Sequence, residues 1–223
     1  MPLTAVLLAG VVSVSLSAKR QPPPPAPRLT LTASAWNIRY SAGLPAHPSP
    51  LAGMSGWWVN LPVAPGSLNY LTTPYTTPMP QDKSVTFTAQ IVAMDGTPVF
   101  NFMLEPWNTC DYPAHVRAYF EQQAPKGCPD ATYTCAPATA RWWANPIAVE
   151  LAVGVVTVTV PLTPEQWSDA EGEIGSAQLA GFAAALGHPA AIGLTFGGGC
   201  FFGHGVNVSG GTARFILSNY VVQ

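Results

Sequence analysis

Alternation of hydrophobic and polar residues is the dominant pattern from Leu29 to the C-terminus. In the segments Leu29–Ser34, Gly56–Leu61 and Val155–Leu162 every second residue is apolar, which is typical of strands with one buried face. Further strands are expected at Leu68–Leu71, His115–Glu121, Arg141–Trp143, Ala191–Phe196 and Thr212–Val222. The pattern therefore predicts about eight or nine strands.

The clearest alternation lies on both sides of Asp95–Gly96. Val85, Phe87, Ala89 and Ile91 alternate with polar residues before this dipeptide, and apolar residues alternate again from Thr97 to Leu104. Asp-Gly between two alternating runs favours a two-residue hairpin turn. We expect Thr86–Ile91 to pair antiparallel with Thr97–Phe102.

Only two segments show helical features. Thr163–Gln166 has proline at the first helical position, and Ser176–Leu186 carries an apolar stripe closed by Gly187. Because strands and helices do not alternate, a parallel sheet is not expected. The chain is predicted to be an all-β protein, a two-sheet antiparallel sandwich of the jelly-roll type with two short helices between late strands; an immunoglobulin-like sandwich is the alternative.

Composition limits the classes of function. Charged residues make up only 9% of the 223 residues, and the nine Lys and Arg are scattered. Without a basic patch, nucleic acid is not an expected partner. With so few charges the surface must be covered by uncharged polar residues, Pro and Gly, which is common in secreted β-proteins, and the 24 prolines and 20 glycines favour turns over long helices.

The sequence predicts that the chain is divided into three parts. Residues 1–17 contain an apolar run with a small-x-small site and resemble a secretory signal, although no Lys or Arg precedes the run; an N-terminal strand is the alternative. Residues 18–28 form a proline-rich spacer, and residues 29–223 form the sandwich. The mature protein is expected in a secreted or periplasmic location, with no integral membrane anchor after cleavage.

The four cysteines indicate two disulfides in an exported chain. Three pairings are open; Cys128–Cys135 with Cys110–Cys200 is favoured, because the first pair closes a short loop. The alternative is four free cysteines in a reducing compartment. No Cys-x2-Cys pair is present, so no metal site is expected.

The stretch Phe196–Val206 holds five glycines in eleven residues, together with Cys200 and His204. Such density predicts close approach of another backbone or a ligand. It matches neither a phosphate loop nor a dinucleotide fingerprint, and no cofactor is expected. His204 is a candidate base or ligand contact, and a structural histidine is the alternative.

The aromatic residues are the main functional candidates. Trp57–Trp58 and Trp142–Trp143 are adjacent pairs in predicted strands, so one member of each pair should face outward. An exposed tryptophan can stack on a sugar ring beside polar hydrogen-bonding groups. The ligand-binding candidates are Trp58, Asn60, Trp107, Tyr112, Trp142 and His204.

The order of strands from Leu29 to Val222, ending in the strand Thr212–Val222, resembles the galactose-binding-like jelly rolls, which include many carbohydrate-binding modules. Segments Arg141–Pro146 and Gly197–Val206 are also similar to bacterial exported proteins of no assigned function. The resemblance implies glycan binding without catalysis. No ligand residue of that family is transferred onto this chain.

Two other functions are compatible with the sequence. The first is a jelly-roll hydrolase or lyase acting on carbohydrate, with catalytic residues drawn from His204, Tyr112, Arg117 and a loop carboxylate. The second is a structural domain of an envelope or extracellular assembly, which would bury all four paired tryptophans.

Overall fold

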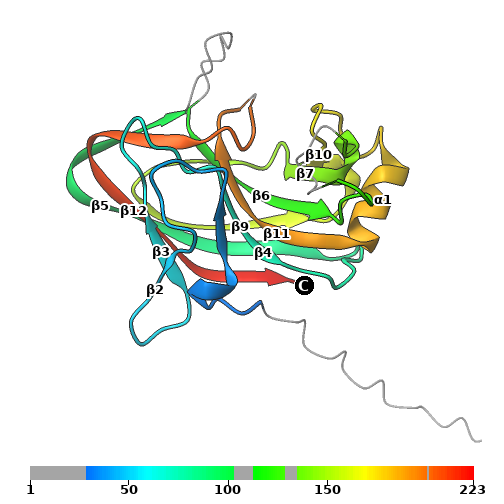
Figure 1. Ribbon diagram of the computed structural model, residues 1–223, viewed down its shortest axis with the longest axis horizontal. Helices are drawn as coiled ribbons and strands as arrows, with labels where there is room; N and C mark the ends of the chain where they lie inside the picture. The colour runs from blue at the N-terminus through cyan, green and yellow to red at the C-terminus, as the bar shows by residue number, and fades with distance from the viewer. Residues whose placement is uncertain (1–28, 103–112, 129–134, 200) are drawn as a thin grey trace, which may run out of the picture.

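The computed structural model describes residues 29–102, 113–128, 135–199 and 201–223. Two antiparallel sheets pack face to face as a sandwich (Figure 1). The strands are β1 Asn37–Arg39, β2 Ser49–Pro50, β3 Trp57–Asn60, β4 Tyr70–Pro74, β5 Ser84–Phe102, β6 His115–Gln122, β7 Arg141–Ala144, β8 Val149–Glu150, β9 Gly154–Pro161, β10 Trp167–Ser168, β11 Pro189–Gly197 and β12 Val206–Val222. The helices are α1 Leu179–Gly187 and the 3-10 turns η1 Ala33–Ala35, η2 Ala138–Ala140 and η3 Pro164–Gln166.

The sheet order is that of a jelly roll. One sheet runs β2-β3-β12-β5-β9, and the other runs β1-β4-β11-β6-β7-β10 with β8 added to β6. Eight strands form the jelly roll and can be numbered one to eight along the chain: β3, β4, β5, β6, β7, β9, β11 and β12. In these numbers the first sheet has the order 1-8-3-6 and the second sheet has the order 2-7-4-5. This double Greek-key arrangement confirms the fold class predicted from the alternation.

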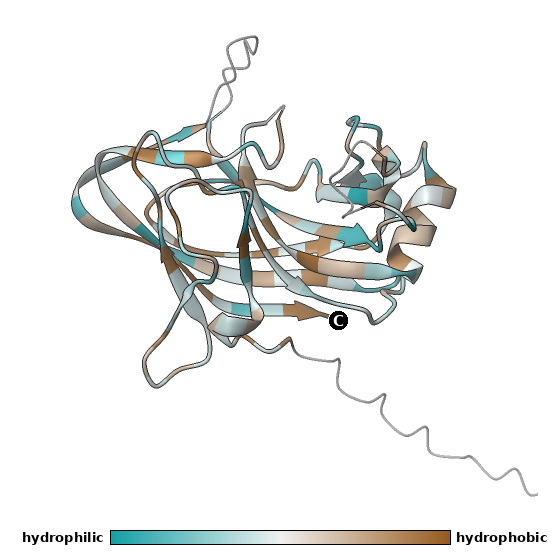
Figure 2. Ribbon diagram, in the orientation of Figure 1, coloured by the Kyte–Doolittle hydropathy of each residue, from teal (hydrophilic) through white to brown (hydrophobic). Residues whose placement is uncertain are grey.

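The core lies between the sheets. Along β6 the even-numbered residues from Val116 to Phe120 belong to the core, and the odd-numbered residues face the other side of the sheet. Figure 2 shows the same interleaving of hydrophobic and polar positions along the ribbons. The large, fully buried side chains of the molecule include Trp36, Trp57, Phe87, Phe120, Trp142, Trp167, Phe182, Phe196, Phe215 and Tyr220.

The predicted hairpin at Asp95–Gly96 is wrong. β5 is a single strand of 19 residues that runs through this dipeptide, and the segments on both sides of the dipeptide pair with β12. Gly96 (φ 62°) and Gly210 (φ 69°) adopt left-handed conformations where the register between the two strands shifts. The Asp-Gly signal thus marks an irregularity in a long ladder, because glycine serves a bulge as well as a turn.

The strand expected at Leu29–Ser34 requires correction. Leu29–Ser34 shows the expected alternation of burial but forms no ladder; it ends in η1, and Trp36 Nε1 donates to the Thr30 carbonyl at 3.3 Å. Tyr220 of β12 is 1% exposed, and the register of β12 shifts between Leu217 and Asn219 just before it. Its hydroxyl donates to the Gly193 carbonyl at 2.9 Å, across the sandwich.

The helical predictions are confirmed in outline. Ser176–Leu186 becomes α1, which begins later, at Leu179, and Thr163–Gln166 becomes the 3-10 turn η3. Phe182 of α1 packs edge-on against Trp142 and Phe120, with ring centroids 4.9 and 5.9 Å away. The helix therefore covers the β6–β7 end of the core.

Candidate functional site

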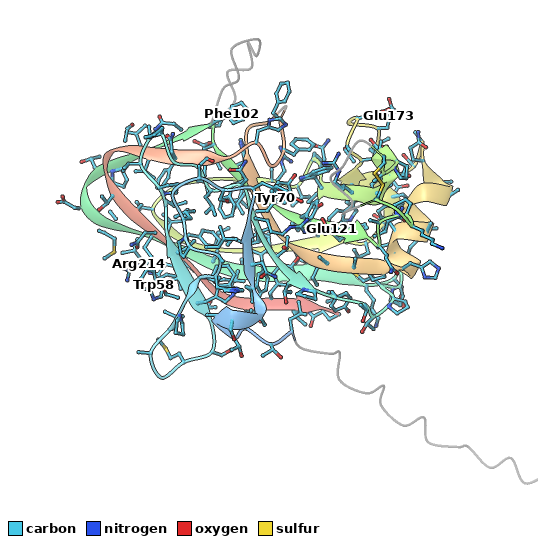
Figure 3. The ribbon with its side chains drawn as sticks, viewed as in Figure 1. Trp58, Tyr70, Phe102, Glu121, Glu173 and Arg214 are labelled. Atoms are coloured by element: carbon cyan, nitrogen blue, oxygen red, sulfur yellow. A yellow bond between two sulfur atoms is a disulfide. The ribbon has the colours of Figure 1, made fainter. Side chains whose placement is uncertain are left out.

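The outer face of the seven-stranded sheet carries a cavity of about 540 Å³. Its floor comes from Tyr70 at the start of β4 and from Arg141 and Trp143 of β7. One wall is the turn 169–172, and the other is the part of the glycine-rich stretch at 201–204. We call this cavity the outer-face pocket; Tyr70 lies near the middle of the molecule in Figure 3.

Aromatic rings make the pocket floor. Tyr70, Tyr119 and Trp143 form a small buried cluster separate from the main core. The Tyr119 ring centroid lies 5.2 Å from those of both Tyr70 and Trp143, and Phe202 lies 6.3 Å from Trp143. Because β-strand residues alternate in direction, these rings lie on the face opposite the inter-sheet core.

An ion pair ties the strands below this cluster. Arg39 Nη1 donates to Glu121 Oε1 at 2.7 Å, and the Tyr119 hydroxyl donates to Glu121 Oε2 at 2.7 Å. Burial opposes the charge of Arg39, but the attraction and hydrogen bond of Glu121 outweigh it and raise the pKa of the guanidinium. The network links β1 to β6 across β4 and β11 and holds the floor in place.

The glycine-rich stretch fits tightly against this floor, as its composition predicts. A Cβ on Gly203 would overlap the Tyr70 ring and hydroxyl, so only glycine fits there. Asn69 Nδ2 donates to the Gly203 carbonyl at 3.2 Å. This contact places His204 on the pocket lining, where its ring lies 5.2 Å from the Phe201 ring.

The opposite wall is held by Asp169. Its Oδ1 accepts hydrogen bonds from the backbone N–H groups of Glu171 and Glu173, each at 3.0 Å, and its backbone N–H donates to the Glu173 carbonyl at 2.9 Å. Asp169 is 3% exposed. Its carboxylate therefore shapes the turn, whereas the exposed Glu171 lies at the rim.

Three buried polar atoms of pocket-lining residues lack a hydrogen-bond partner in the described part of the chain: Arg141 Nε, Trp143 Nε1 and Asn69 Oδ1. Trp143 is 3% exposed, so its indole N–H is removed from solvent. A buried donor or acceptor without a partner costs about 1–3 kcal/mol. The pocket lining thus combines aromatic rings with buried polar atoms that have no hydrogen-bond partner among the described residues.

Trp58 and Asn60 lie on the other sheet, away from this pocket. Trp58 is half-buried, and the Arg214 guanidinium stacks 3.6 Å from its ring centroid, while Arg214 Nε donates to Asn60 Oδ1 at 3.0 Å (Figure 3). Both residues border a smaller cavity of about 350 Å³. The structure therefore does not bring these two candidates together with His204.

The prediction that Trp142 is a ligand-binding residue is wrong. It is fully buried between the sheets, so it is not available to a ligand. The member of the pair on the outer face is Trp143, and it lines the pocket. Candidates Trp107 and Tyr112 lie outside the described residues.

The disulfide Cys128–Cys135 is confirmed, with Cα atoms 6.0 Å apart. The predicted partner pair Cys110–Cys200 lies outside the described residues. In the described part of the chain no three His, Cys, Asp or Glu side chains gather as a metal site would require. Among the same residues, no helix has the length and hydrophobicity to cross a membrane.

The sequence did not indicate several pocket residues. Asn69 and Tyr70 are adjacent at the start of β4, whereas Arg141 belongs to β7, and nothing in the sequence marks these two segments as neighbours. Asp169 lies close in sequence to Glu171 and Glu173, and such an acidic run is typical of a solvated face. The alternation rule could have identified Trp143, since it requires only the choice of the other member of the Trp142–Trp143 pair.

The buried tyrosines provide a test of this packing. Burial raises the pKa values of Tyr70, Tyr119 and Tyr220, so the folded protein keeps their hydroxyls protonated above pH ~10, where unfolded tyrosine ionises. The unfolded state then binds fewer protons, and stability falls as the pH rises above ~10. Absorbance titration of tyrosinate should show these three ionising only together with unfolding, and ionisation of all seven tyrosines in the folded state would contradict the packing.

No protein-family model matches the chain, and a search of curated proteins finds no match. The site must therefore be interpreted from its own geometry.

Proposed function

We propose that the protein is an exported β-sandwich that binds a saccharide in the outer-face pocket. The observation that carries the proposal is the joint presence of aromatic rings and unpartnered polar atoms at Trp143, Arg141 and Asn69. A sugar ring offers an apolar face for stacking and hydroxyls that both donate and accept. A cavity of about 540 Å³ lies within the size range of small-ligand sites.

Export is supported by two features. The Cys128–Cys135 disulfide is of the kind that persists in oxidising compartments. The apolar N-terminal run followed by a proline-rich spacer has the composition of a cleaved signal and linker. Export would place the pocket among extracellular or periplasmic glycans.

The experiment is a glycan-array screen of the purified protein, followed by titration of the bound saccharides with tryptophan fluorescence as the readout. Trp143→Phe keeps an aromatic ring but removes the indole N–H. We expect it to weaken binding about fivefold, the loss of roughly one hydrogen bond.

Trp58→Phe is the matched control, because it makes the same change on the opposite sheet, and its affinity should equal that of the wild type. Failure of every saccharide to bind would remove the proposal. Weaker binding by Trp58→Phe, with Trp143→Phe unchanged, would move the site to the other sheet.

One observation supports a second candidate, a carbohydrate hydrolase or lyase. His204 and Tyr70 line the same pocket, and such groups can act as general acid or base. Incubation of each bound oligosaccharide with the protein, followed by product analysis, separates the two functions. Intact saccharide after prolonged incubation supports binding alone, and cleavage abolished by Tyr70→Phe supports the enzyme.

A further inference from the structure

The outer face of the seven-stranded sheet carries arginines that have no carboxylate partner among the described residues. Arg39, Arg117 and Arg141 lie on this face, and the described residues contain one ion pair, Arg39–Glu121. Within the part of the chain that the structure describes, the Arg141 side chain has no hydrogen-bond partner for its Nε, and the Arg117 side chain makes one hydrogen bond, from Nη1 to the Ala144 carbonyl at 2.9 Å. Among the described residues, the guanidinium groups of Arg117 and Arg141 therefore have no carboxylate partner.

In the described ranges, Arg141 forms no ion pair with Glu121, the acidic residue opposite it. Glu121 is its direct cross-strand partner in the β6–β7 ladder. Both oxygens of Glu121 are already engaged, one by Arg39 and the other by Tyr119. The Arg141 side chain instead lies over Trp143, with its guanidinium carbon 5.5 Å from the ring centroid, and lines the pocket.

The two acidic residues on the pocket wall, Asp169 and Glu171, do not take the place of Glu121 as a partner of Arg141. The Asp169 Oδ1 atom is held by the two backbone N–H groups of its own turn, and no ion pair joins Asp169 to Arg141 within the described ranges. Glu171 is exposed at the rim, where water screens its charge. The Arg141 guanidinium keeps its capacity to bind an anion inside the pocket.

Arg117 strengthens the positive field from below. It is 6% exposed, and its guanidinium carbon lies 4.1 Å from the centroid of the Phe202 ring that covers it. Burial lowers the pKa of Arg117 to about 10, so the group remains charged at neutral pH. An anion bound above Phe202 would offset part of this cost.

We infer that the saccharide bound in the outer-face pocket carries an oxyanion, a carboxylate or a sulfate ester, and that this oxyanion pairs with the guanidinium of Arg141. The inference rests on the proposed function and specifies its ligand class. Arginine suits this role because its planar fork matches an oxyanion with two parallel hydrogen bonds. The aromatic floor formed by Trp143 and Tyr70 would hold the sugar ring beside it.

The test uses matched saccharide pairs. Uronate tetrasaccharides are titrated beside the same molecules with their carboxylates reduced to alcohols, and sulfated tetrasaccharides beside their desulfated forms. The wild type should bind an acidic form at least about tenfold more tightly than its neutral counterpart, as expected for a charge-assisted bidentate contact. The two pairs identify which oxyanion is the natural one, and preference for either acidic form supports the inference.

Arg141→Gln should bring the acidic-to-neutral affinity ratio close to one, and the control Arg214→Gln, on the opposite sheet, should retain the wild-type ratio. Equal binding of acidic and neutral forms by the wild type would overturn the inference and leave the proposed function standing. A preference that survives Arg141→Gln would also overturn it. Failure of all four forms to bind, with no saccharide bound on the array, would instead remove the proposed function.

Discussion

Replacing Trp142 by alanine is expected to lower the free energy of unfolding by about 3–5 kcal/mol, the usual range for truncating a fully buried aromatic side chain. Trp142 has no exposed surface, and its ring packs against Phe120 and Phe182. Its Nε1 also donates to the Thr139 carbonyl at 2.8 Å. The substitution leaves a cavity between β6, β7 and α1 that this rigid sandwich cannot fill.

Denaturant unfolding measures the effect, and the melting temperature should fall by roughly 10 °C for a domain of this size. Trp58→Ala is the control, since it removes the same side chain from a half-buried position on the outer face of the other sheet. It should cost about 1 kcal/mol, mostly the cation–π contact with Arg214. Equal losses for the two variants would contradict the assignment of Trp142 to the core.

Replacing Glu121 by glutamine is the second large perturbation. The side chain is 7% exposed, and it neutralises Arg39 while accepting the Tyr119 hydroxyl. Removing the charge leaves the Arg39 guanidinium, whose side chain is 22% exposed, without its carboxylate. We expect a loss of about 2–3 kcal/mol, below the range for fully buried pairs because water still reaches Arg39.

A double-mutant cycle isolates the pair. Arg39→Met with Glu121→Gln should recover part of the loss, because the unpaired guanidinium is removed with its partner. Glu150→Gln, at an exposed glutamate of β8, should change stability by less than about 0.5 kcal/mol. Additive losses at Arg39 and Glu121 would show that the two side chains do not interact in solution.

Most of the fold follows from alternation, because burial on one face of a strand imposes a period of two on the sequence. β3, β6, β7, β9 and β11 lie close to their predicted positions for this reason. Alternation does not say what a strand pairs with. Leu29–Ser34 alternates without a ladder, and the two halves of β5 pair with β12 rather than with each other.

The glycine signals show the same limit. Asp95–Gly96 and the dense glycines of Phe196–Val206 both mark positions where backbone comes close to its neighbours, and the structure confirms a close approach at each. Whether such a glycine makes a turn or a bulge depends on the strand beside it, here β12. For Gly96 that strand lies more than a hundred residues away, so the local sequence around Asp95–Gly96 carries no information about it.

The site was harder to predict than the fold. His204 was identified from its own surroundings, but its pocket neighbours Tyr70, Arg141 and Asp169 come from distant segments that only the jelly-roll topology brings together. For the Trp142–Trp143 pair, the period of two separated the members correctly. It could not decide which member faces the core, because that depends on where β7 lies in the sheet.

The most direct test of the saccharide pocket is the two-dimensional NMR spectrum of the tryptophan indole N–H groups during titration with a saccharide found on the array. The chain has seven tryptophans, and the spectrum of Trp143→Phe assigns the Trp143 signal by its absence. We predict that the Trp143 signal shifts as the saccharide is added, while the signal of Trp57, buried between the sheets, stays in place. A shift confined to the Trp58 signal, or saturated binding with no change at Trp143, would contradict the account.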